Sequence, residues 1–170
     1  MKKVCIVING AGGVGKDTLC DIAAKHFKVK NISSITPIKE VAALCGWDGT
    51  KDNKARKFLS DLKNLCVEYN NYPTLWAKAQ YDDFLQTDEE VMFVHIRESE
   101  EIKKFVDATN GAALTLLVRG GKRMSSAKYG NVSDDEVENY GYDYYFLNEA
   151  SLEEAETNFV ALLNGILSKN

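Results

Sequence analysis

The chain has 170 residues, of which 45% are hydrophobic and 27% charged, and its formal net charge is −4. This length and hydrophobic content suit one α/β domain, which we expect to span residues 1–170. The slightly acidic balance gives no electrostatic footprint for nucleic acid or for an anionic membrane. The apolar run after Met1-Lys2-Lys3 is too short for a signal peptide, and no apolar stretch has the length of a membrane span. We therefore expect a cytoplasmic monomer or homodimer without nucleic-acid or membrane partners.

The cysteine and histidine content favours neither redox chemistry nor a metal site. No two cysteines have Cys-x-x-Cys spacing, and each stands among apolar neighbours. We expect them to be small buried side chains that are kept reduced. His26 and His95 are too far apart in the sequence to suggest a metal centre. The four cysteines are Cys5, Cys20, Cys45 and Cys66.

The first predicted element is a strand over residues 3–9, and it leads into a glycine-rich loop. The frame Gly-x-x-x-x-Gly-Lys runs from Gly10 to Lys16, and helical periodicity then predicts a helix over residues 16–27. A strand, a glycine loop and a helix in this order indicate a phosphate-binding loop. Glycines let backbone N–H groups converge on an anion, the helix N-terminus adds partial positive charge, and Lys16 reaches the β- and γ-phosphates. The residues expected to hold the nucleotide are Gly10, Ala11, Gly12, Gly13, Val14, Gly15, Lys16, Asp17 and Thr18.

The next segment contains one predicted strand followed by helices. The strand is expected over residues 29–35. Thr36-Pro37 is typical of a helix cap with proline at the first helical position, and Gly46 ends that helix. Two further helices are predicted, over about 54–70 and from Pro73 to about 87. The longer one carries an apolar face made of Phe58, Leu62, Leu65, Cys66 and Tyr69.

The second half of the chain alternates strands and helices. Strands are predicted at 91–96, 113–118 and 144–147, with a helix before Gly111, and Ser151 with Glu154 forms a capping box for a closing helix. This alternation predicts a three-layer α/β sandwich with a five-stranded parallel sheet. In such sheets the ligand lies beyond the carboxyl ends of the strands.

The loop also carries a family resemblance. Its order Gly-Lys-x-Thr resembles the adenylate-kinase-like branch of P-loop kinases, and Gly-Lys-Asp-Thr looks like the deoxynucleoside monophosphate kinases of phages and bacteria. The resemblance implies a P-loop NTPase fold with a lid, ATP and Mg²⁺ as cofactors, and a small phosphomonoester as acceptor. Most such loops have a Mg²⁺-binding hydroxyl directly after the lysine, where this chain has Asp17. We expect Asp17 to lie close to the metal and to orient it through water, because Mg²⁺ keeps several waters.

Basic residues that follow the predicted strands match positions of this family. Arg97 corresponds to the arginine of an Asp-Val-Arg segment beside the acceptor phosphate, while His95 stands at the acidic position and is expected to provide no metal ligand. Arg119 matches an arginine that covers the adenine ring. Arg123 is the best candidate for an arginine of the lid, which is expected over about 119–142. The alternatives are a surface ion pair for Arg97 and a solvated basic loop for the lid.

The remaining candidates concern the donor base and the acceptor. Asn148 lies in a segment that resembles the family's Asn-x-Gly-Ser-Leu turn beside the donor base, or it caps a turn. The acceptor is expected among the helices of residues 36–87. The candidates there are the basic residues Lys39, Arg56 and Lys63 and the aromatic residues Trp76 and Tyr81. The alternatives are a solvated helix face for the basic residues and a core position for the aromatic ones.

The sequence therefore predicts an ATP-dependent kinase that transfers the γ-phosphoryl group to a small phosphomonoester. The expected acceptor is a (deoxy)nucleoside monophosphate, and Lys16, Arg97 and Arg123 are the predicted catalytic residues. One alternative is a kinase of a non-nucleotide phosphomonoester, with an acceptor like phosphomevalonate or dephospho-coenzyme A. The other is a nucleotide-binding module that has lost catalysis, an option that His95 and the missing hydroxyl leave open.

Overall fold

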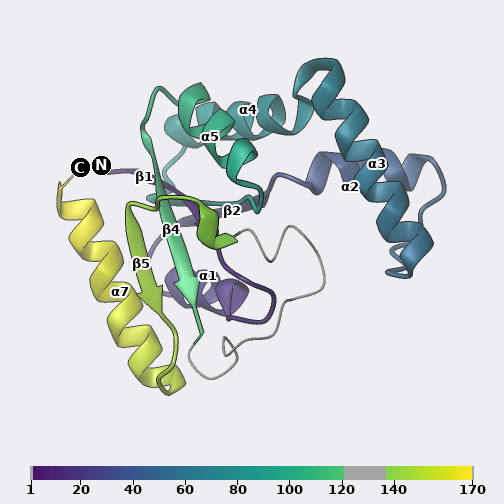
Figure 1. The fold of residues 1–170 in the computed structure, drawn as a ribbon. Helices are drawn as coiled ribbons and strands as arrows, with labels where there is room; N and C mark the ends of the chain where they lie inside the picture. Colours follow the sequence, from purple (N-terminus) through teal and green to yellow (C-terminus); the bar gives the residue numbers. More distant parts are fainter. Residues whose placement is uncertain (1, 121–136, 170) are drawn as a thin grey trace.

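A five-stranded parallel sheet forms the centre of the computed structural model, which describes residues 2–120 and 137–169 (Figure 1). The strands are β1 (Val4–Asn9), β2 (Val29–Ser33), β3 (Val91–His95), β4 (Ala113–Arg119) and β5 (Tyr144–Leu147), in the spatial order β2-β3-β1-β4-β5. The central strand β1 pairs with β3 and β4, and all six of its residues are buried. Burial on both faces explains why this strand reads as a continuous apolar run. The predicted α/β fold with five parallel strands is confirmed.

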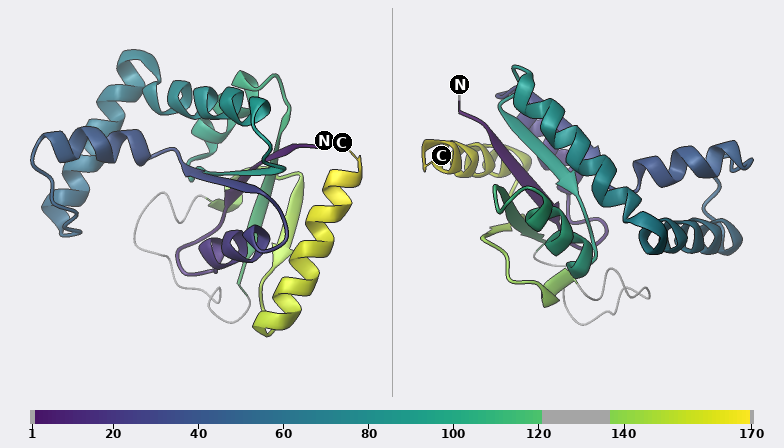
Figure 2. Two further views of the ribbon diagram at one scale, coloured as in Figure 1. Left: turned by 180° about the vertical axis from the view of Figure 1, so that it is seen from behind. Right: turned by 90° about the horizontal axis from the view of Figure 1, so that it is seen from above.

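Helices cover both faces of the sheet, as Figures 1 and 2 show. α1 (Lys16–Ala24) and α7 (Leu152–Lys169) lie on one face, and α4 (Tyr72–Gln86) and α5 (Ser99–Ala108) on the other. Alternate residues of β1 point into the two cores, with Ile6 and Ile8 toward α1 and α7, and Cys5 and Val7 toward α4 and α5. The sheet is therefore the middle of three layers.

Two helices and their connection, residues 36–70, project from this body, and we call them the helical arm (Figure 2). It consists of α2 (Thr36–Leu44) and α3 (Asn53–Asn70). The apolar face predicted for α3 is only partly covered: Leu65 is 64% and Tyr69 88% exposed, while the other three residues, Phe58, Leu62 and Cys66, are half-buried. The only buried residue of α3 is Ala55. The reason is that α3 packs mainly against α2 and α4.

Some local predictions hold and others need correction. The capping box is confirmed, because Ser151 Oγ accepts from the Glu154 backbone N–H at 3.3 Å and the Glu154 carboxylate accepts from the Ser151 N–H at 3.3 Å. The cap at Thr36 is wrong: the helix begins at Thr36 itself, Ile35 is its N-cap, and no side chain caps it. The predicted helix over 16–27 ends at Ala24.

The cysteine prediction holds for half of the set. Cys5 and Cys20 are buried free thiols, whereas Cys45 is exposed and Cys66 is half-buried, because both of these belong to the helical arm. Among the helices that the structure describes, none combines the length and apolarity needed to cross a bilayer.

Candidate phosphate-binding site

The glycine loop at residues 10–15 connects β1 to α1, and the neighbouring strand ends fix its path. Gly10 has φ 149°, and a Cβ there would collide with the carbonyl oxygen of Val118 on β4. Gly15 has φ 93°, and a Cβ there would lie 2.5 Å from the side-chain nitrogen of Asn148. Both positions therefore need glycine for conformation and for space. The loop is held in place before any ligand binds.

Lys16, the first residue of α1, folds its side chain back over the loop. Its ammonium donates to the carbonyl oxygens of Gly10 at 2.5 Å and Ala11 at 2.9 Å. Asp17 and Thr18, in the first turn of α1, are exposed. The Lys16 ammonium, the N-terminus of α1 and the exposed glycines of the loop thus lie together. These are the groups that bind anions in proteins.

Asn9 connects three parts of this site from a fully buried position. Its side-chain Nδ2 donates to the carbonyl oxygen of Arg97 at 3.0 Å and to the hydroxyl of Tyr142 at 2.8 Å. Its Oδ1 accepts from the Gly10 backbone N–H at 2.8 Å. The Tyr142 hydroxyl in turn donates to the carbonyl oxygen of Val137 at 2.7 Å. The side-chain amide of Asn9 therefore connects the glycine loop, the segment after β3 and the segment before β5.

His95 is the last residue of β3, Arg97 follows two residues later, and the charges of Lys16, Asp17 and Arg97 all act on the His95 imidazole. Burial lowers the pKa of His95, the charges of Lys16 and Arg97 lower it further, and the charge of Asp17 opposes them. The His95 Nε2 lies 2.9 Å from Asn31 Oδ1, so this N–H donates to Asn31. The structure thus places His95, Arg97, Lys16 and Asp17 together at the carboxyl ends of β1 and β3.

Arg119 ends β4 on the other side of the loop. Its Nε and Nη2 donate to the two carboxylate oxygens of Glu138, at 3.0 and 2.6 Å. Glu138 belongs to the short 3₁₀ turn η1 (Val137–Asn139). The guanidinium carbon lies 4.7 Å from the centroid of the Tyr145 ring on β5. Arg119 is thus held in a fixed orientation at the edge of the sheet.

Asn148 follows β5 and braces the loop. Its side-chain Nδ2 donates to the Val14 carbonyl oxygen at 2.9 Å, and its backbone N–H donates to the Arg119 carbonyl oxygen at 2.7 Å. These contacts give Asn148 a structural role, and its predicted place beside the donor base stays a prediction.

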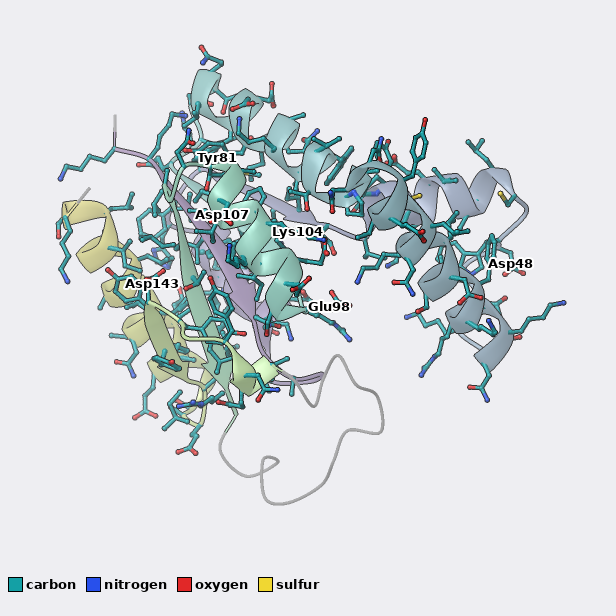
Figure 3. The ribbon with its side chains drawn as sticks, turned by 45° about the horizontal axis from the view of Figure 1, so that its top comes forward. Asp48, Tyr81, Glu98, Lys104, Asp107 and Asp143 are labelled. Carbon is teal, nitrogen blue, oxygen red and sulfur yellow. The ribbon has the colours of Figure 1, made fainter. Side chains whose placement is uncertain are left out.

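The candidate acceptor residues are spread along the helical arm. Arg56 donates from Nε to the Lys51 carbonyl oxygen at 2.9 Å, in the connection that also holds Asp48, which Figure 3 shows at the far end of the arm. Lys39 is exposed in the first turn of α2. Lys63, by contrast, reaches the body, and its ammonium pairs with Glu98 at 2.6 Å beside Arg97. The acceptor-binding role of Lys39, Arg56 and Lys63 stays a prediction.

Two further predictions fall on the residues around the expected lid and on the aromatic side chains. Arg123 and most of the segment 119–142 lie outside the described residues. Trp76 and Tyr81 are partly buried and pack against the core that α4 and α5 form with the sheet, which favours the core alternative, while a role in stacking on the acceptor stays a prediction.

The donor set for a metal ion is sparse. In residues 2–120 and 137–169, no three acidic, histidine or cysteine side chains gather closely enough to hold a metal by themselves. Asp17 offers an exposed carboxylate directly after Lys16. Mg²⁺ prefers oxygen ligands and is often held by one carboxylate, waters and substrate phosphates. The site fits a Mg²⁺ ion that arrives with a nucleotide, and Asp17 stays the predicted metal-orienting residue.

Sequence reasoning missed three residues of this site: Asn9, Glu138 and Tyr145. Asn9 carried a usable signal, because a polar residue that ends an apolar strand just before a glycine loop is placed beside the ligand. Glu138 and Tyr145 carried none, since only the fold brings them to Arg119.

No family model matches the sequence, and no curated protein sequence matches it either. Solved structures do match. A shikimate kinase from Bacteroides thetaiotaomicron is similar with a TM-score of 0.53 and 15% identity, over 95% of this chain and 98% of that one. A putative kinase from Chloroflexus aurantiacus is similar with a TM-score of 0.54 and 10% identity, over 97% of this chain and 98% of that one. At such identities the likeness shows the fold alone, which matches the α/β P-loop NTPase fold.

Proposed function

We propose that the protein is an ATP-dependent kinase that phosphorylates a small phosphomonoester, with a (deoxy)nucleoside monophosphate as its acceptor. The observation that carries this proposal is the position of Lys16. Its ammonium lies over the glycine loop and donates to the carbonyl oxygens of Gly10 and Ala11. Phosphate oxygens are stronger acceptors for an ammonium than neutral carbonyls, so a bound triphosphate would draw Lys16 onto the β- and γ-phosphates.

The chemistry requires positioning and charge neutralisation. An oxygen of the acceptor phosphate attacks the γ-phosphorus while the bond from that phosphorus to the β–γ bridging oxygen breaks, leaving ADP and a diphosphate. Lys16 and the loop N–H groups hold the donor oxygens on which negative charge develops. Mg²⁺, when bound with ATP near Asp17, neutralises phosphate charge. Arg123 is proposed to meet the transferring group from the lid.

Arg97 is the proposed partner of the acceptor phosphate. It follows β3, which is next to β1 in the sheet, and its carbonyl is fixed by Asn9 at 3.0 Å. A planar guanidinium matches two phosphate oxygens at once, which suits an arginine for alignment. The helical arm starts from β2 at the neighbouring edge, and we propose that Lys39 and Arg56 contact the acceptor when the arm and the body close on it.

A phosphotransfer screen tests the proposal. The wild-type protein is incubated with ATP, Mg²⁺ and single acceptors, and ADP formation is measured. The panel contains ribo- and deoxyribonucleoside monophosphates, phosphomevalonate, dephospho-coenzyme A and shikimate, the last because a protein of similar fold is a shikimate kinase. We expect turnover with at least one nucleoside monophosphate and none with shikimate.

The controls separate the possible failures. Lys16→Ala must abolish any turnover that belongs to this site, while Lys25→Ala, an exposed lysine at the end of the same helix, must leave it unchanged. Turnover restricted to non-nucleotide phosphomonoesters would overturn the acceptor assignment. If ATP binds but no acceptor is phosphorylated, the protein is a nucleotide-binding module instead.

A further inference from the structure

The environment of Arg119 supports an inference beyond the transfer reaction. Arg119 pairs with Leu147 in the β4–β5 register, and its carbonyl oxygen accepts from the Asn148 N–H at 2.7 Å. Asn148 also donates to the Val14 carbonyl of the glycine loop at 2.9 Å. The backbone of Arg119 is thus joined to the phosphate loop through one residue. The next residue, Gly120, also lies against the loop, since a Cβ built there would be 3.6 Å from Val14 Cγ1.

The guanidinium of Arg119 is fixed in two directions. The bidentate contact with Glu138, at 3.0 and 2.6 Å, sets the plane and the in-plane rotation of the guanidinium. The Tyr145 ring lies under one face, with the guanidinium carbon 4.7 Å from its centroid. The Arg119 side chain is still 42% exposed. The exposed surface of Arg119 therefore lies on the guanidinium face opposite Tyr145 and on the edge that Glu138 does not contact.

Tyr145 is itself held in place. Its ring makes an edge contact with Tyr142, at 6.0 Å between centroids and an interplanar angle of 77°. Its hydroxyl accepts from the Tyr142 backbone N–H at 3.3 Å. Tyr142 is the residue whose hydroxyl contacts Asn9. The orientation of Arg119 is thereby tied to the same hydrogen-bonded group that holds the loop.

Two exposed apolar side chains of β5 lie next to this guanidinium. Tyr145 and Leu147 point to the same side of β5 and are 49% and 59% exposed. β5 is an edge strand, and α4 and α5 cover the other strands on that face. A flat ligand with an apolar face suits an oriented guanidinium beside exposed leucine. Exposed ion pairs add little stability because solvent screens them, so stability alone does not explain the arrangement.

We propose that Glu138 and Tyr145 are positioning residues that hold Arg119 as a preformed platform for the nucleobase of the donor. This inference rests on the proposed function in one respect, namely that the donor is a nucleoside triphosphate. Glu138 and Tyr145 act through Arg119 and do not contact the phosphates. By orienting Arg119, Glu138 and Tyr145 determine how much the nucleobase contributes to the affinity for the donor nucleotide.

The experiment compares ATP with inorganic tripolyphosphate, which has the phosphates without the base. Dissociation constants of both are measured for the wild type and for Tyr145→Leu, Glu138→Gln and Arg119→Ala. We expect each of the first two to weaken ATP binding by about 2- to 5-fold, the scale of an exposed cation–π contact, and to leave tripolyphosphate binding unchanged. Tyr145→Phe, which keeps the ring and loses the hydroxyl that accepts from the Tyr142 N–H, is expected to weaken ATP binding less than Tyr145→Leu does.

A double-mutant cycle distinguishes positioning from a general structural role. In the Arg119→Ala background, Tyr145→Leu is expected to have no further effect on ATP binding. Tyr69→Leu, on the helical arm, is the matched control, because Tyr69 is exposed and belongs to a different element. The inference is overturned if Tyr145→Leu leaves ATP binding unchanged, weakens tripolyphosphate equally, or keeps its effect without Arg119.

The proposed function fails in a different way. If wild-type ATP binding is absent, or does not depend on Lys16, the donor assignment itself is wrong. If ATP binding depends on Lys16 and the cycle shows no coupling, only the platform is wrong.

Discussion

The glycine loop and the helical arm are built in opposite ways. Around the loop, every residue of β1 is buried, and Asn9 makes three hydrogen bonds from a fully buried position. In the arm, α3 has eighteen residues and buries only Ala55. Its described ion pair to the body is the Lys63–Glu98 contact, and Figure 3 shows Glu98 at the start of α5.

The difference in burial between the loop and the arm suits two different tasks, binding the donor and admitting the acceptor. A loop that must surround a triphosphate is most effective when it is already in position, because nothing then has to be reorganised during transfer. A segment that must admit an acceptor and then exclude water has to move, and elements with few buried contacts open at low free-energy cost. We infer that donor binding is preorganised and that the arm adapts to the acceptor.

The largest expected effect comes from removing the charge at the loop. Lys16→Ala should lower kcat by at least about 100-fold, because the ammonium stabilises charge that develops on the transferring group. The fold should persist, since Lys16 is only partly buried and contacts the loop itself. Steady-state kinetics and circular dichroism check both parts. Near-normal turnover would contradict the proposed role of Lys16 in transfer, and loss of the fold would show that its side chain is needed for stability.

Arg97→Ala should damage use of the acceptor more than binding of ATP. The expected rise in acceptor KM is about 10- to 100-fold, since hydrogen bonds to charged groups contribute on the order of 2 kcal/mol. The KM for ATP should change far less. Initial-rate measurements with each substrate varied in turn show which one responds. An equal loss for both substrates would place Arg97 on the donor side.

A pair of stability measurements tests the comparison directly. Asn9→Ala removes three buried or part-buried hydrogen bonds, those with the Arg97 carbonyl, the Tyr142 hydroxyl and the Gly10 N–H, so the free energy of unfolding should fall by about 2–3 kcal/mol. Leu65→Ala on the arm should change it by less than about 0.5 kcal/mol, because Leu65 is largely exposed. Urea denaturation provides both values. Similar losses for the two variants would show that the arm is as tightly packed as the loop.

The same two regions show what sequence can predict. β1, the loop and α1 are encoded locally: an apolar run, spaced glycines and a helix start within about fifteen residues need no tertiary information. The partners of Asn9 and Arg119 are not local. Asn9 contacts residues 88 and 133 positions away, and Glu138 reaches Arg119 only through the path of the chain.

The arm shows the opposite limit. The apolar pattern of α3 is the same as that of a core helix, and nothing in the sequence of α3 distinguishes the two cases. Whether Leu65 and Tyr69 are covered depends on where α2 and α4 place the helix. A helical pattern therefore predicts a helix, whereas burial of its apolar face is a tertiary property.

A smaller effect concerns the metal requirement at the loop. Asp17→Asn should raise the Mg²⁺ concentration for half-maximal activity by on the order of 10-fold, the usual loss when an outer-shell carboxylate is removed. His95→Asn should leave this concentration nearly unchanged, because the His95 Nε2–H donates to Asn31. Activity is titrated with Mg²⁺ at fixed ATP. The reverse order of effects would make His95 the residue that orients the metal.

The smallest expected effect is the pH dependence that His95 adds to the stability of the loop region. Its pKa in the folded protein lies below the ordinary value of 6.5, chiefly because the imidazole is partly buried. As the pH falls through 6.5, the unfolded chain takes up a proton at this site before the folded protein does. The free energy of unfolding should therefore decrease with falling pH in this window, and level off for this group below the folded pKa. Denaturation at pH 7.0 and 5.5 measures the decrease, and His95→Asn should make it smaller. An equal decrease in the variant would show that His95 does not couple protonation to folding, and would leave the rigidity of the loop to the glycines, Asn9 and Asn148.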